Sequence, residues 1–136
     1  MRLFVAIQLP EAIKDTLTAM CGGVDDARWR EREQLHLTLR FIGDMDGAMA
    51  RDIDDGLHQI AAPAFSLTLR GTGFFNERKL ARVLWAGVED DAALRHLHKK
   101  IQHGLTTIGL QPERRRYHPH VTLARLRHAT PDAIAP

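Results

Sequence analysis

Segments 36–39 and 120–123 share one pattern, His-x-Thr-Leu, in which x is Leu or Val. An imidazole gives or takes a proton near neutral pH, because its ordinary pKa is about 6.5. A threonine hydroxyl can donate a hydrogen bond to a phosphate oxygen. Two copies of this pair therefore offer an acid, a base and two oxygen-binding groups, which suits general acid–base catalysis on a phosphate ester.

The first copy lies in an alternating sequence that predicts a strand over 35–42. Because successive side chains of a strand point to opposite faces, His36, Thr38 and Arg40 share one face. The alternate residues, which end at Phe41, form the apolar face that we expect to pack on helices.

The second copy lies in a strand predicted over 118–126. Alternation places His118, His120 and Thr122 together on one face. The same rule places Arg125 on the opposite face, so that it could reach the site only from the end of the strand.

The elements around the two copies repeat in the same order. A strand at 2–9, a helix and a polar loop precede the strand at 35–42, and a strand at 81–88, a helix and a basic loop precede the strand at 118–126. Such self-similarity indicates an internal duplication. The two motifs then belong to equivalent positions of two halves.

We therefore predict an α+β fold with two pseudo-symmetric lobes, each a small, mostly antiparallel sheet with helices outside, and an active-site cleft between the lobes. Residues 1–136 form one domain with repeat halves at about 1–75 and 80–136. Only a short segment at 131–136 follows where the first half has a helix and a strand, so either the second lobe is reduced or the sequence lacks its C-terminal part, and we expect the latter because a missing strand would leave an unpaired sheet edge.

Other elements show weaker signals. In the first helix, Ile13, Leu17 and Met20 form the expected buried stripe. Asp46 is the expected N-cap of the next helix, and an alternating run at 65–69 predicts a strand that leads into a glycine bend.

Composition restricts the class of protein. The chain has 136 residues, one cysteine and a net charge of +2. No apolar run has the roughly 18 residues that a membrane span needs, so we expect a cytoplasmic protein without a membrane partner. A sequence pI near 9.0 suits a protein that binds anions.

Further residues near the motifs could bind a substrate. Arg116 ends a basic run that begins at residue 114, and with Tyr117 it could hold an RNA backbone and stack on a base. An equally simple interpretation is a solvated basic loop. Phe75 could be a stacking platform or part of the core, and His118 could tune His120 or bind substrate.

A metal site is the first rival interpretation, because eight histidines are many for this length. His96 and His103 lie seven residues apart on a helix with no evident acidic partner, whereas a zinc site needs three or four converging ligands. We expect no metal and no cofactor. The second rival is a non-catalytic RNA-binding module that uses the basic loops.

The segments QLHLTLRFIGD and RRYHPHVTLARL resemble the two signatures of the two-histidine (2H) phosphoesterases. More narrowly, they resemble the RNA 2′,3′-cyclic phosphodiesterases, also called the 2′-5′ RNA ligase or LigT-like group. The segments RLFVAIQLP, FSLTLRGTGFF and ARVLWAGV match in the same order. Members of that family continue with a helix and a further strand or two beyond the point where this sequence ends, so the resemblance and the internal repeat lead to the same expectation for the second lobe.

The resemblance implies hydrolysis of RNA 2′,3′-cyclic phosphate ends to 2′-phosphomonoesters without a metal. It makes His36 the proton donor and His120 the proton acceptor, with Thr38 and Thr122 as donors to phosphate oxygens. Arg125 matches a position that could neutralise phosphate charge. The implied partner is RNA or a nucleotide with a cyclic phosphate end, and we expect a monomer. Reversible 2′-5′ ligation and activity on another cyclic nucleotide stay open.

Overall fold

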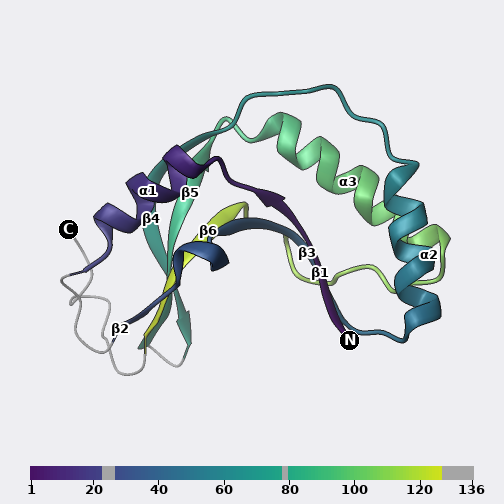
Figure 1. Cartoon of the computed structure of the whole chain (residues 1–136), viewed down its shortest axis with the longest axis horizontal. Helices are drawn as coiled ribbons and strands as arrows, with labels where there is room; N and C mark the ends of the chain where they lie inside the picture. Colours follow the sequence, from purple (N-terminus) through teal and green to yellow (C-terminus); the bar gives the residue numbers. More distant parts are fainter. Residues whose placement is uncertain (23–26, 78–79, 127–136) are drawn as a thin grey trace. The chain divides into compact units, whose positions relative to one another are not determined.

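A computed structural model describes residues 1–22, 27–77 and 80–126, and this part of the chain contains six strands, three α-helices and one 3₁₀ helix (Figure 1). The strands are β1 (Arg2–Gln8), β2 (Ala27–Trp29), β3 (His36–Asp44), β4 (Thr68–Glu77), β5 (Leu80–Glu89) and β6 (His120–Leu126). The helices are α1 (Glu11–Met20), η1 (Arg32–Gln34), α2 (Gly47–His58) and α3 (Ala92–Thr107). The segment 131–136, where the sequence places the start of a further helix, lies outside the described residues.

Hydrogen bonds connect the strands in the order β1-β3-β6-β5-β4, and β2 also pairs with β6. The pairings of β6 with β2, β3 and β5 are all antiparallel. Helices and a mainly antiparallel sheet thus confirm the predicted α+β class.

The chain forms two compact units. The first unit comprises Met1–Ala6, Thr38–Thr68 and Glu89–Pro119. The second unit comprises Ile7–Leu37, Leu69–Val88 and His120–Pro136. Each unit draws on both sequence halves, so the compact units and the repeat halves of 1–75 and 80–136 are different divisions of the chain.

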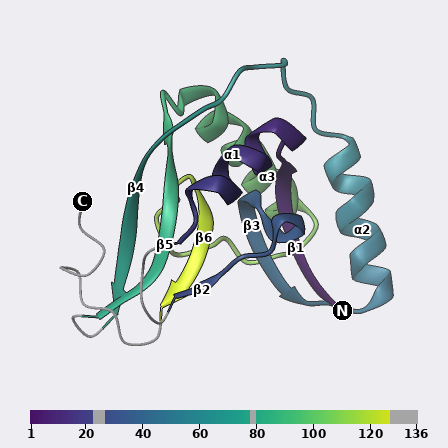
Figure 2. The ribbon, with the colours of Figure 1, turned by 60° about the vertical axis from the view of Figure 1, so that its left-hand side comes forward.

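In the first unit, β1 lies beside β3, and α2 packs against α3 (Figure 2). Asp46 caps α2 as predicted, since its carboxylate accepts a hydrogen bond from the Met49 N–H at 2.8 Å. Gly109, with φ 104°, follows the end of α3. The buried face of α3 consists of Leu94, Ile101 and Leu105.

In the second unit, β4, β5 and β6 lie side by side (Figures 1 and 2). Leu35, Leu37 and Val121 are among the most deeply buried side chains of the protein. Each such burial contributes about 1.5–3 kcal/mol. These apolar contacts fix the backbones of β3 and β6, and with them the opposite face on which the motif histidines lie.

Helix α1 does not bury the stripe that the sequence predicts. Leu17 is buried, but Ile13 and Met20 are 38% and 57% exposed, and Lys14 is buried instead. The methylene stem of a lysine can cover apolar surface while its amine reaches a polar group, here the Glu11 carboxylate at 3.9 Å. The hydrophobicity pattern alone therefore predicted the wrong buried face for this helix.

The strand predicted over 65–69 starts later, because β4 begins at Thr68. It also continues through Gly71 instead of ending in a bend there. Gly71 has φ 75°, a conformation that glycine adopts without the steric cost of a Cβ. The glycine thus makes an irregularity inside a strand.

In β3, the predicted alternation holds up to Leu39 and then changes phase. Arg40 is only 7% exposed, whereas Phe41 is 65% exposed and lies beside Phe4, with ring centroids 6.3 Å apart. The prediction that Phe41 packs inward was wrong. The side chain of Arg40 takes the buried position because it finds hydrogen-bond acceptors there.

The acceptors for Arg40 belong mainly to α3 and the segment that follows it. Its guanidinium donates to the Gln102 side chain, to the Gln111 carbonyl oxygen at 2.6 Å and to the Phe41 carbonyl oxygen at 3.1 Å. A buried charge is tolerated when it is hydrogen-bonded in this way. Arg40 therefore ties β3 to α3.

Candidate active site

The two motif histidines lie on one face of the second unit. Leu37 and Val121 are direct partners in the antiparallel ladder between β3 and β6, and both are fully buried. His36 and His120 each precede one of these partners, so their side chains lie on the opposite face. One step along the ladder, His36 lies across from Thr122, and residues directly opposite have Cβ atoms about 4.5–5.5 Å apart. The strand pairing thus gathers two imidazoles and a hydroxyl.

Aromatic rings from β4 and β5 surround His120. The ring of Phe75 meets the imidazole edge-on, at 86° and a centroid distance of 5.0 Å. Trp85 lies 6.3 Å from His120 and 5.5 Å from Phe75. Gly73 makes room for this packing, because a Cβ there would lie 2.4 Å from Cζ2 of Trp85. The half-buried Phe75 thus orients the second motif histidine by contact.

His36 has an electropositive environment. Burial, followed by the charges of Arg30 and Lys14, lowers the pKa of His36 below its ordinary value. Arg30 follows β2, and its backbone N–H donates to the Leu123 carbonyl oxygen of β6 at 2.8 Å. The free protein therefore favours a neutral imidazole at His36, and an anion bound beside it would favour the protonated form.

A β-bulge interrupts β6 at Leu123, the last residue of the second motif. Trp85 pairs with Thr122, but the preceding Leu84 pairs with Ala124, so Leu123 is an extra residue without a partner in β5. Leu123 and Ala124 are consequently both buried, although they are neighbours in the strand.

The bulge changes the face on which Arg125 lies. Arg125 pairs with Val83, and Val83 shares a strand face with Trp85, the partner of Thr122. The exposed Arg125 therefore lies on the His120 face. Simple alternation predicted the opposite face, and that prediction was wrong because it counted the extra residue as a regular one.

β2 and its arginines were not predicted from the sequence. Arg28 is the direct partner of Arg125 in the β2–β6 ladder, and both side chains are exposed. The strand has three residues and lies in a charged stretch, so neither length nor hydrophobicity marks it. The alternating arginines at positions 28 and 30 are the signal that could have identified it.

In the first unit, contacts with α3 position Tyr117 and Thr38. The Tyr117 hydroxyl donates to the Thr38 carbonyl oxygen at 3.1 Å, and burial is the main cause that raises the pKa of Tyr117 to about 12. Its ring stacks on His98, with centroids 3.9 Å apart and an interplanar angle of 4°. Arg95 donates to the Tyr117 carbonyl oxygen at 3.1 Å. These contacts connect the first motif to α3 through one tyrosine.

Arg116 and His118 are exposed residues of the segment between α3 and β6. The strand was predicted from residue 118 but begins at His120. Pro119 has no N–H and cannot donate to a strand ladder, which explains the later start. The prediction that His118 and His120 share a strand face was therefore wrong.

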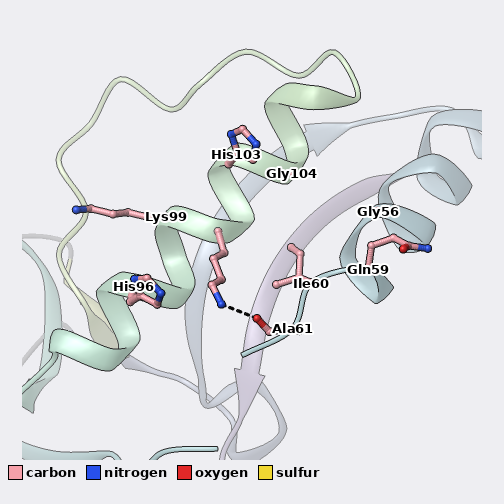
Figure 3. A pocket seen from close by; sticks show the side chains of 9 residues that line it. Gly56, Gln59, Ile60, Ala61, His96, Lys99, His103 and Gly104 are labelled. Atoms are coloured by element: carbon pink, nitrogen blue, oxygen red, sulfur yellow. Dashed lines mark hydrogen bonds between the residues drawn. The ribbon is translucent and has the colours of Figure 1, made fainter. Parts of the chain in front are cut away.

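A separate pocket of about 500 Å³ lies in the first unit, between α2 and α3 (Figure 3). Four basic side chains line it, but they do not converge. Lys100 donates to the Ala61 carbonyl oxygen at 2.6 Å, and Lys99 extends away from Ile60 and Ala61. None of the predicted site residues lines this pocket.

Within residues 1–22, 27–77 and 80–126, no group of three or more His, Cys, Asp or Glu side chains is arranged to hold a metal ion. In the same part of the chain, no helix is long and apolar enough to cross a membrane.

Solved structures have the same fold. The TT0787 protein of Thermus thermophilus aligns with a TM-score of 0.82 and 30% identity, over 96% of this chain and 77% of that one. Escherichia coli LigT, solved with 3′-AMP, aligns with a TM-score of 0.81 and 29% identity, over 99% of this chain and 77% of LigT. The fold is thus that of the 2H phosphoesterases.

The sequence profile of the 2′-5′ RNA ligase superfamily matches residues 9–136, and the chain belongs to that superfamily. A protein of Thermotoga maritima named RNA 2′,3′-cyclic phosphodiesterase is 31% identical over 134 residues, which cover 94% of this chain and 71% of that protein.

Two further relatives have the same name. The protein of Aeropyrum pernix is 41% identical over 100 residues, which cover 73% of this chain, and the protein of Geobacillus stearothermophilus is 31% identical over 128 residues, which cover 90%. The matched regions make up 57% and 41% of the lengths of these two relatives.

Proposed function

We propose that the protein hydrolyses RNA 2′,3′-cyclic phosphate ends to 2′-phosphomonoesters by metal-independent acid–base catalysis. The observation that carries this proposal is the pairing of Leu37 with Val121, which places His36 and His120 on one sheet face. The names of the relatives support the choice of substrate.

In the proposed reaction, His120 takes a proton from water, and the water oxygen forms a bond to phosphorus. The bond between phosphorus and the 3′-oxygen breaks, and His36 gives its proton to the departing oxygen. The products are a 2′-phosphate and a free 3′-hydroxyl. Thr38 and Thr122 donate hydrogen bonds to the non-bridging oxygens, where negative charge develops. Each positioned proton transfer typically contributes about 10²–10⁴-fold.

The environment of His36 suits a donor that is charged only when substrate is present. Burial, Arg30 and Lys14 lower the pKa of His36 in the free protein. A bound phosphate anion opposes the effect of the two cations, because an opposite charge nearby favours the protonated imidazole. The substrate would thereby promote protonation of its own general acid.

Other residues would bind the RNA. Arg125 neutralises charge on the reacting phosphate, since the bulge places it on the His120 face. Phe75 holds His120 and offers a partly exposed ring to the terminal base. Arg116 and His118 contact the RNA backbone from their exposed segment, and the stacked Tyr117 shapes that segment.

The direct test is turnover of an oligonucleotide with a 2′,3′-cyclic phosphate end in the presence of EDTA. We expect a 2′-phosphate product, identified by its resistance to enzymes that act only on 3′-phosphates. Turnover that appears only after metal addition would contradict the metal-independent mechanism. RNA binding without turnover of any cyclic phosphate would favour a binding module, and turnover of cyclic mononucleotides alone would favour another cyclic nucleotide.

The same assay extends to the reverse reaction. We would incubate an RNA with a 2′,3′-cyclic phosphate end together with an RNA with a free 5′-hydroxyl end at high concentration. The longer, 2′-5′ linked product would be measured by gel electrophoresis. Sedimentation of the active protein would test the expected monomer.

A further inference from the structure

Arg28 and Arg125 form a pair that protein stability does not explain. They are direct cross-strand partners in the β2–β6 ladder, and both are exposed. Like charges directly opposite one another destabilise a sheet. Among the described residues, neither guanidinium has a carboxylate within ion-pair distance. A like-charge pair of this kind suits the binding of an anion.

The pair lies on the face that carries the motif side chains. Arg125 shares its face with Thr122 because of the bulge at Leu123, and direct partners in a ladder project to the same face, so Arg28 joins them. Arg30, two residues after Arg28, has its backbone bonded to Leu123. Positive charge thus continues from the motif along β2.

The spacing leaves Arg125 within reach of the reacting phosphate and places Arg28 beyond it. Arg125 follows Thr122 by three positions along β6, which corresponds to at most roughly 10 Å at about 3.3 Å per residue. Arg28 lies in β2, the strand that pairs with β6 at Arg125. Two guanidinium groups whose Cβ atoms are about 4.5–5.5 Å apart can bind one phosphate from two sides, and arginine binds phosphate through two parallel N–H bonds.

We propose that Arg28 and Arg125 together bind the phosphodiester on the 5′ side of the terminal nucleotide, so that the protein acts on RNA oligonucleotides in preference to cyclic mononucleotides. This inference rests on the proposed function. Arg125 then contacts both the reacting phosphate and the neighbouring phosphodiester, whereas Arg28 contacts only the neighbouring phosphodiester. RNA of at least two nucleotides would be needed for full affinity.

The test compares Arg28→Gln with the parent protein. We measure kcat/KM on a cyclic mononucleotide and on an oligonucleotide that ends in the same nucleotide. The ratio of the oligonucleotide value to the mononucleotide value should fall roughly ten- to a hundred-fold, as expected for hydrogen bonds to a charged group. Arg51→Gln, which removes an exposed arginine of α2, should leave the ratio unchanged. An unchanged ratio in Arg28→Gln, or an equal loss on both substrates, would overturn the proposal.

A binding measurement keeps this test independent of turnover. Oligonucleotides that end in a 2′-phosphate are titrated into parent and variant at several salt concentrations. The slope of log affinity against log salt should decrease by about 0.7 in Arg28→Gln, the value for one phosphate contact on a single strand. If the parent binds in this way but never hydrolyses a cyclic phosphate, the proposed function fails while the arginine site stands.

Melting temperatures distinguish a binding role from a structural one. Removal of the repulsion between Arg28 and Arg125 should raise the melting temperature of Arg28→Gln by a few degrees. A clear decrease would show that Arg28 supports the fold and would contradict the proposed role.

Discussion

The two His-x-Thr strands, β3 and β6, have the same burial pattern over their first six residues. In each, the histidine and threonine are half-buried, the residues after them are buried, the fifth residue is also buried and the sixth is exposed. Both strands therefore keep strict alternation through the motif and change phase directly after it.

The residues at the phase change differ. In β3 the fifth residue is Arg40, whose hydrogen bonds tie the strand to α3, and the sixth is Phe41. In β6 the corresponding residues are Ala124 and Arg125, and the arginine is exposed. One backbone pattern thus places an arginine in a structural position in the first strand and in a solvent-facing position, open to a substrate, in the second.

The largest expected effect comes from substitution of the two motif histidines, because β3 and β6 each contribute one histidine to a single site. His36→Ala and His120→Ala should each reduce kcat on a cyclic phosphate end about 10²–10⁴-fold. The double variant should lose much less than the product of the two, because the groups act in one step. His103→Ala, at an exposed position of α3, is the control. Full activity in either single variant would show that the two motif strands do not contribute equally to the site.

The threonines are expected to give the next effect. Thr38→Val and Thr122→Val each remove a hydroxyl that would donate a hydrogen bond to a charged phosphate oxygen. Each change should reduce kcat/KM roughly ten- to a hundred-fold. Thr72→Val in β4 is the matched control, since it changes an exposed strand threonine outside the motifs. A loss in one motif variant only would show that a single hydroxyl contacts the phosphate.

The third prediction concerns how much Arg40 and Arg125 each contribute to the free energy of unfolding. Arg40→Leu should reduce the free energy of unfolding by about 1–3 kcal/mol, because it leaves buried acceptors without a donor. Arg125→Leu should change it by no more than about 0.5 kcal/mol, as is usual at exposed positions. Urea unfolding monitored by tryptophan fluorescence measures both. Similar losses in the two variants would contradict the division of roles.

The smallest effect concerns the acidity of His36. Arg30→Gln removes one of the cations that lower its pKa, so the pKa should rise toward its ordinary value. If His36 is the proton donor, the high-pH limb of the kcat/KM profile moves to higher pH. If it is the proton acceptor, the low-pH limb moves instead. NMR titration of the imidazole gives the pKa directly, and an unchanged value would show that Arg30 does not act on His36.

The sequence predicted the α+β class, the motif strands and the cap at Asp46, because hydrophobic alternation and capping are local signals. It failed where tertiary contacts decided. The buried position of Arg40 depends on acceptors in and after α3, and the burial of Lys14 depends on its long stem. The face of Arg125 depends on the partner strand, since a bulge exists only relative to a ladder.

The bulge at Leu123 makes the position of Arg125 depend on how β6 pairs with β5 as well as on the residue types in β6. Deletion of this one leucine would remove the extra residue, so that Ala124 would follow Thr122 in regular alternation and Arg125 would stay on the His120 face, opposite Val83. A change that keeps Leu123 but removes the bulge would instead turn Arg125 to the apolar face, so the register between β5 and β6 decides which face this arginine occupies.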